Sequence, residues 1–119
     1  MKIEAIAKQL VALCRKADWE TAQKKLYAVN ATSCEAESSP DFAKETKGRK
    51  AIIAKGRKFT AMIEKLHALK VSDPIVAEDF FACTMMIDMT MKGQGRMKLS
   101  ELCVYEVKKG KIVAEHFHY

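Results

Sequence analysis

The sequence lacks any apolar run that approaches the roughly 18 residues needed for a membrane-spanning helix. Near the N-terminus, the charged residues Glu4 and Lys8 interrupt the segment in which a secretory signal peptide would need an unbroken apolar stretch. These two absences exclude the membrane and secreted classes that such segments mark. We therefore predict a cytoplasmic protein with no membrane partner.

The four cysteines also lack the spacing that marks a metal site or a disulfide framework. No CxxC pair occurs, and the cysteines are spread along the chain among apolar residues: Cys14, Cys34, Cys83 and Cys103. Disulfide frameworks are typical of smaller secreted chains with little core. In apolar surroundings Cys behaves as a small hydrophobic residue, so we expect free thiols, no metal and no cofactor.

The chain does contain enough hydrophobic residues to form the core of one folded domain. It has 119 residues, of which 49% are hydrophobic and 30% are charged. This length is close to the commonest domain size, and no internal repeat divides the sequence. We predict a single domain over residues 1–119.

The positive charge is concentrated in residues 44–58, which hold seven basic residues and the single acid Glu45. Such a stretch could attract nucleic acid or an anionic ligand. Only Phe42 and Phe59 lie in or near it, and no stacking platform or nucleic-acid motif accompanies it. The interpretation that we favour is a solvated helix face with no nucleic-acid partner, and nucleic-acid binding is the alternative.

Helical spacing of apolar residues predicts three helices in the first half of the chain. The first covers residues 2–15, the second begins after the capping residue Asp18, and the third runs from about Gly48 to Leu66. Between the second and third helices we expect a short strand over residues 28–35, followed by an irregular connection over residues 36–47.

The second half of the chain reads as strands joined by glycine-containing turns. The predicted strands cover residues 67–72, 75–91, 96–107 and 111–119. The turns between the last three fall at GQG (93–95) and KKG (108–110). Helices followed by a run of antiparallel strands predict an α+β fold, with the helices on one face of the sheet.

The predicted strand that ends at Met91 is apolar on both of its faces. A sheet covered by helices on one side only should alternate between apolar and polar side chains. The second face therefore needs a cover, and a second copy of the chain is the simplest one. We expect a homodimer formed through the outer face of the sheet.

Particular segments resemble the SnoaL-like branch of the nuclear-transport-factor-2-like superfamily. The segment LYAVNATSCEAESSP, followed by GRKAI, is similar to the second helix, the first strand and the start of the third helix of this family. The segment VYEVKKGKIVAEHFHY is similar to its closing hairpin. The resemblance covers nearly the whole chain. It implies a cystatin-like α+β roll, in which three N-terminal helices pack on the concave face of a cone-shaped, curved antiparallel sheet. The superfamily includes isomerases, cyclases, dehydratases and binding modules, so the resemblance does not fix a reaction.

The enzymes of this superfamily place a carboxylate base just after the second helix, on the first strand. Alignment with the ketosteroid isomerase pattern puts Glu35 at that position. At the mouth of an apolar cone, desolvation would disfavour the charged form of this carboxylate and move its pKa toward a useful range for proton transfer. The alternative is an exposed glutamate at the end of a strand.

The remaining machinery of the family is not matched. Ketosteroid isomerases stabilise the dienolate oxygen with a first-helix tyrosine and a protonated acid on a later strand. These two positions correspond here to Leu10 and Cys103. Polyketide cyclases use an acid near the end of the last strand, and Phe117 stands at that position. Both known sets of catalytic residues are therefore incomplete in this sequence.

Strand alternation suggests which residues replace them, because side chains two residues apart share a face. If Cys103 and Phe117 face the cavity, four further residues do so: Glu101, Tyr105, Glu115 and Tyr119. With Glu35, the candidate catalytic residues are then three carboxylates, which would raise one another's pKa values and suit proton transfer or the binding of a cation. The alternative is that Glu101 or Glu115 pairs with a Lys or Arg.

Further residues are predicted to line the pocket: Tyr27, Phe59, His67 and Asp88. The face on which Asp88 lies depends on the register of the hairpin at GQG, since a slip of one residue reverses it. His116 and His118 have the spacing of a metal pair, but alternation points them away from the cavity, and we predict no metal site there.

These features predict a pocket for a small apolar or cationic molecule. As an enzyme, the protein would be a cofactor-free lyase or isomerase that acts by proton abstraction, with Glu35 as the first candidate base. The alternative is a non-catalytic ligand-binding or dimeric interaction module.

Overall fold

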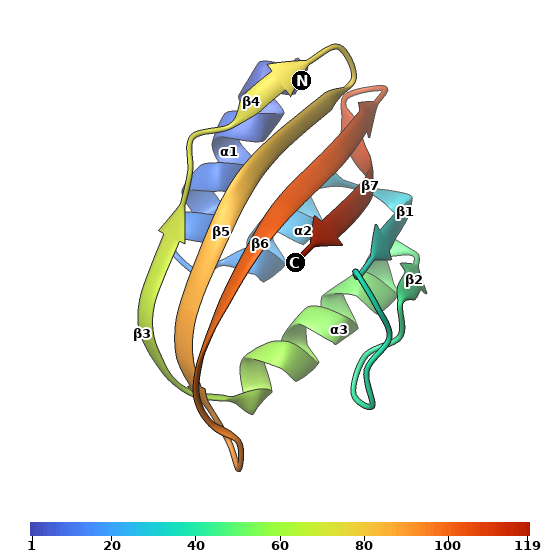
Figure 1. Ribbon diagram of the computed structural model, residues 1–119. Coiled ribbons are helices and arrows are strands. Elements are labelled where there is room, and N and C mark those ends of the chain that lie inside the picture. The colour runs from blue at the N-terminus through green and yellow to red at the C-terminus, as the bar shows by residue number, and fades with distance from the viewer.

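The computed structural model describes residues 1–119 and shows three helices packed against one face of a curved sheet (Figure 1). The helices are α1 (Ile3–Arg15), α2 (Trp19–Leu26) and α3 (Arg49–Met62). The core lies between them and the concave side of the sheet, as an α+β roll requires. The predicted fold class is confirmed. No helix is long and apolar enough to cross a membrane.

The sheet has seven strands and does not close. They are β1 (Tyr27–Cys34), β2 (Glu45–Lys47), β3 (Ile63–Val71), β4 (Ile75–Ala77), β5 (Phe80–Met91), β6 (Gly95–Lys108) and β7 (Lys111–His118). Their order is β2-β1-β7-β6-β5-β3, and β4 pairs with the other end of β5 (Figure 1). One pairing differs from the antiparallel sheet that we expected, because β1 and β7 run parallel. Most of the chain lies between these two strands, and parallel neighbours need such a long connection.

The element boundaries differ from the predicted ones where pairing with a distant strand decides them. Helix α3 ends at Met62 rather than at Leu66, because Ile63 already pairs with Met91 and Leu66 pairs with Met89 across the edge of β5. Ladder hydrogen bonds satisfy the backbone there in place of another helical turn. The predicted strand over residues 75–91 is interrupted at Glu78, whose φ of 53° is incompatible with continuous pairing.

The connection that we predicted to be irregular contains strand β2. Thr46 of this strand pairs with Ser33 of β1, so β2 forms one edge of the sheet. Gly48 follows with a φ of 93°, a conformation that glycine adopts at no steric cost, and turns the chain into α3. The first strand and the third helix are thereby fixed next to each other, and both contribute to the site described below.

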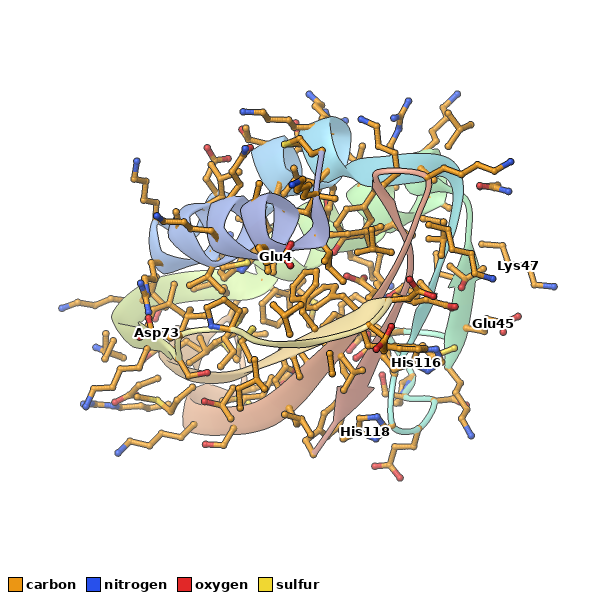
Figure 2. All side chains as sticks on the ribbon, turned by 90° about the horizontal axis from the view of Figure 1, so that it is seen from above. Glu4, Glu45, Lys47, Asp73, His116 and His118 are labelled. Atoms are coloured by element: carbon orange, nitrogen blue, oxygen red, sulfur yellow. The ribbon has the colours of Figure 1, made fainter.

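The two exposed histidines of β7 lie on the far side of the sheet from the helices. Figure 2 shows His116 and His118 beyond the sheet, away from the side chains that fill the space under the helices. Strand alternation placed them on this outer face. They are therefore separated from the interior of the roll by the sheet itself.

Candidate functional site

A cavity of about 150 Å³ lies between the helices and the concave side of the sheet. Its lining includes 18 residues, and because 12 of them are hydrophobic the space is mainly apolar. Part of the lining is a row of aromatic rings from α2, α3 and the β1–β2 connection. In this row the ring centroid of Phe59 lies 6.4 Å from that of Trp19 and 6.4 Å from that of Phe42, with edge-to-face geometry.

The three candidate carboxylates all line this cavity: Glu35, which the family resemblance singled out, and Glu101 and Glu115, which strand alternation singled out. The pairing of β6 with β7 places Tyr105 opposite Glu115, and that of β5 with β6 places Met85 opposite Glu101. Paired residues share a face, so both acids project to the concave side. Their catalytic roles stay predictions, but their positions can be compared in detail.

Glu35 is held in an ion pair at the end of β1. Its Oε2 lies 3.0 Å from Nζ of Lys55 on α3, and its Oε1 accepts a hydrogen bond of 3.2 Å from the Tyr119 hydroxyl. The side chains of Lys55 and Glu35 are only 16% and 19% exposed. Both oxygens of Glu35 are therefore engaged by groups of the protein.

Glu115 is buried and is satisfied by neighbours on β1. The Tyr27 hydroxyl donates a hydrogen bond to its Oε1, and the Ser33 hydroxyl donates another. Burial raises the pKa of Glu115, while the hydrogen bonds from Ser33 and Tyr27 act in the opposite direction. Burial and the same carboxyl also raise the pKa of Tyr27 well above its ordinary value, so the tyrosine keeps its proton.

Glu101 differs from the other two acids because neither an ammonium group nor a hydroxyl group binds it. Its only side-chain hydrogen bond comes from Sγ of Cys103, at 3.7 Å from its Oε1. Burial, which has the larger effect, and the negative charge of Glu35 raise the pKa of Glu101 to about 7. Glu101 therefore changes its protonation state near neutral pH, and its Oε2 has no hydrogen-bond partner in the protein.

Of the other predicted pocket residues, five line the cavity: Leu10, Tyr27, Phe59, Tyr105 and Phe117. Tyr105 also stacks on Phe81, with ring centroids 4.7 Å apart, which fixes its orientation.

Four predicted pocket residues lie elsewhere. The ring Nε2 of His67 lies 2.7 Å from the Thr90 hydroxyl oxygen, at a bulge in the β3–β5 pairing. Asp88 alternates with the cavity residue Ile87 and so projects from the outer face, where Arg96 binds both carboxylate oxygens at 3.0 Å. These two corrections follow from the register of β5.

The other two corrections concern Cys103 and Tyr119. Cys103 is on the concave face but is fully buried, directly across from Cys83, so it lies in the core beneath the cavity. Tyr119 is 54% exposed and is connected to the site only by its hydrogen bond to Glu35. Neither contributes a wall of the cavity.

The sequence analysis missed Lys55, which lines the cavity together with the acids. A signal for it existed, because Lys55 stands three residues after the buried Ile52 and four before Phe59, on the same face of α3. The other basic residues of this stretch differ in exposure: Arg49 is half-buried and donates to the Tyr27 carbonyl, whereas others lie on the surface. Arg57, for example, pairs on the surface with Glu20, at 2.6 Å.

Comparison with known proteins agrees with this fold. The model of the SnoaL-like domain family matches residues 1–119. A candidate SnoaL-like polyketide cyclase from Mesorhizobium loti is 32% identical, with full coverage of both chains and a TM-score of 0.91. No protein of curated function matches the sequence.

Two more distant structures share the fold. A hypothetical protein from Catenulispora acidiphila with a ketosteroid isomerase-like fold, in complex with trimethylamine, is 17% identical with a TM-score of 0.74; the match covers 96% of this chain and 84% of that one. A protein of unknown function with a cystatin-like fold from Xanthomonas campestris is 16% identical with a TM-score of 0.76, over 98% and 89% of the two chains. With the family model matched from end to end, this chain belongs to the SnoaL-like domain family.

Proposed function

We propose that the cavity binds a small, mainly apolar molecule and that Glu101 takes a proton from a carbon atom of it, without a cofactor. The observation that carries this proposal is the Glu101 carboxyl in an apolar cavity, where its only side-chain hydrogen-bond partner is a thiol. A general base is most effective when its pKa lies near the working pH, and the pKa of Glu101 is about 7. Glu101 thus replaces Glu35, whose oxygens are occupied by Lys55 and Tyr119.

The size of the cavity limits the ligand. An apolar cavity of about 150 Å³ holds a molecule of roughly the size of benzene, and this cavity has that volume. A polycyclic substrate would require side chains such as Trp19 or Phe42 to move. We therefore propose a substrate of about one ring, or a short chain of equivalent volume.

Hydrogen–deuterium exchange tests the proposed reaction. In D₂O, the protein should accelerate exchange of the C–H protons next to the carbonyl in one or more of a panel of small ketones, followed by proton NMR. Glu101→Gln should lower this acceleration by roughly 10²–10⁴-fold, since it removes the base. Glu106→Gln is the matched control, because Glu106 is on the same strand but the opposite face.

Two outcomes of the exchange experiment would contradict the proposal. Equal acceleration by wild type and Glu101→Gln would exclude Glu101 as the base. No acceleration with any member of the panel, despite binding of the compounds, would favour a binding module.

A second candidate function is the binding of a small organic cation. The aromatic lining attracts ammonium groups: Nζ of Lys58 lies 5.1 Å from the ring centroid of Phe42, and Nζ of Lys55 lies 5.7 Å from that of Phe117. The Catenulispora acidiphila structure holds trimethylamine. A cation that pairs with Glu101 would bind more tightly above pH 7 than below it, whereas proton abstraction needs no charge on the ligand.

We also propose that the protein works as a homodimer in the cytoplasm. The outer face of the sheet carries apolar side chains from β5 and β6, including Phe80 and Leu102, which are 47% and 43% exposed. Sedimentation at micromolar concentration should give about twice the mass of the 13.4 kDa chain. Met86→Lys, on the same face, should give monomer or aggregate, because a charge would be buried in the interface. A monomeric wild type would contradict this proposal.

A further inference from the structure

Lys55 reaches from α3 into the cavity and is held there by two hydrogen bonds. Its Nζ donates to the Ser33 hydroxyl at 2.6 Å and to Glu35 Oε2 at 3.0 Å. An ammonium group has three N–H donors, so one remains without a partner in the protein. The side chain is only 16% exposed, and it lines the same cavity as Glu101. The third donor is therefore available to a ligand.

The neighbours of Lys55 hold its ammonium group in place, as is required of a group that stabilises a negative charge developing on an oxygen. Glu35 balances the ammonium charge in the resting protein. Glu115 belongs to the same hydrogen-bonded chain, because the Ser33 hydroxyl accepts from Lys55 and donates to Glu115. Once Glu101 has taken a proton it is neutral. Protonation of Glu101 removes one negative charge from the cavity. The Lys55 ammonium group, still paired with Glu35, keeps its position and its free N–H donor before any charge develops on the ligand.

We infer that Lys55 is a further catalytic residue, which binds the oxygen of a small carbonyl compound and stabilises the enolate formed when Glu101 removes the adjacent proton. This inference rests on the proposed function of Glu101. The C–H bond breaks and its proton goes to the Glu101 carboxylate. The electron pair forms a C=C bond while the C=O π pair moves to the oxygen, and nothing is oxidised or reduced. Return of the proton to carbon, at the same or another position, regenerates Glu101.

A charged donor is suited to this task in the position that Lys55 occupies. Hydrogen bonds from a cation to an anionic oxygen are roughly twice as strong as neutral ones. Loss of one preorganised donor to a developing oxyanion typically lowers turnover by about 10²–10³-fold.

A pair of one-ring probes tests Lys55 separately from Glu101. 4-Nitrophenol, whose ionised form absorbs at longer wavelength, resembles an enolate when ionised, and 4-nitroanisole is its uncharged counterpart. At pH 6 Glu101 is mostly protonated, as it is after proton transfer. Wild type should bind the phenolate, and Lys55→Met should weaken this binding about tenfold or more. The same change should alter binding of 4-nitroanisole by no more than about twofold.

Lys55→Arg is the control that keeps the positive charge, and it should retain most of the phenolate binding. Melting curves of both variants show whether the fold is intact, and 4-nitroanisole shows whether the cavity is. Binding of the phenol only in its neutral form, or equal phenolate binding by Lys55→Met, would overturn the inference and leave the role of Glu101 intact. If neither probe binds to wild type, the inference fails together with the one-ring pocket.

Discussion

Glu101→Gln should make the protein more stable at pH 8, by up to about 3 kcal/mol, and change its stability little at pH 4. The pKa of the Glu101 carboxyl rises from 4.5 to about 7 on folding. The larger cause is the burial of the side chain, and the second is the negative charge of Glu35 nearby. Each pKa unit corresponds to about 1.4 kcal/mol, so keeping this carboxylate charged in the folded state costs about 3 kcal/mol. A neutral amide avoids this cost.

The sign of the pH dependence follows from the direction of the shift. A group whose pKa is raised by folding binds more protons in the folded than in the unfolded state between the two values. The stability that it contributes is fully present below pH 4.5 and is lost as the pH rises through 7. The free energy of unfolding of wild type should therefore fall over this range, and that of Glu101→Gln should not show this component.

Carbon-detected NMR titration measures the pKa of Glu101 directly, and urea unfolding at pH 4, 6 and 8 measures the free energies. Glu106→Gln is again the control, because it removes a carboxyl from the outer face of the same strand. A Glu101 that titrates near 4, together with no gain in stability from Gln at pH 8, would mean that the carboxyl is solvated. Glu101 would then lack the raised pKa on which its proposed role as the base depends.

The fold could be predicted because local patterns carry it. Helical spacing around Leu10 and alternation along β6 and the last part of β7 are set by neighbouring residues, and these patterns identify the helices and the concave face. The end of α3 and the presence of β2 could not be predicted in this way. Both depend on which distant strand is available for pairing, and a window along the sequence does not contain that information.

For the site too, the face on which a residue lies could be predicted from local patterns, but its distant partners could not. Alternation placed Glu101 and Glu115 on the cavity side, because the period of a strand is two. The pairing of β6 with β7 has one irregularity, at Glu106–Val107. It does not separate either acid from the neighbouring cavity residue on the same strand, so the alternation holds where it was used. What alternation could not predict was the partner of each acid. The sequence analysis left open, as the alternative, that Glu101 or Glu115 pairs with a Lys or Arg. In the structure the basic residue of the cavity, Lys55, pairs with Glu35, 20 residues away on another element.

Because Lys55 pairs with Glu35 and not with Glu101, the candidate base changes from Glu35 to Glu101. An acid in an apolar cavity must either find a partner or shift its pKa. Glu35 has Lys55, and Glu115 has the hydroxyls of Tyr27 and Ser33. Glu101 alone has only a thiol, and burial raises its pKa to about 7. Burial raises the pKa of Glu115 as well, but there the hydroxyls of Ser33 and Tyr27 act in the opposite direction. The three carboxylates occupy one cavity but differ in environment, and a difference of this kind separates a reactive acid from structural ones.

Glu115→Ala should destabilise the protein strongly, by about 3 kcal/mol or more, because it leaves the buried hydroxyls of Tyr27 and Ser33 without their acceptor and creates a void. Glu115 is 3% exposed and Tyr27 is equally buried, so water cannot easily replace the missing group. Glu115→Gln keeps the volume and one acceptor oxygen for Tyr27, and should cost less than about 1 kcal/mol. The comparison separates the hydrogen bonds of Glu115 from its charge.

Tyr27→Phe completes the test, since it removes only the hydroxyl that donates to Glu115. This change should cost about 1–2 kcal/mol alone, and little in the Glu115→Ala background, where the hydroxyl has already lost its acceptor. Urea unfolding of the two single variants and the double variant gives the coupling energy. Additive costs would mean that the two groups do not interact in solution. Similar stabilities of Glu115→Ala and Glu115→Gln would show that Glu115 is free of Tyr27, and Glu115 would then become a second candidate base beside Glu101.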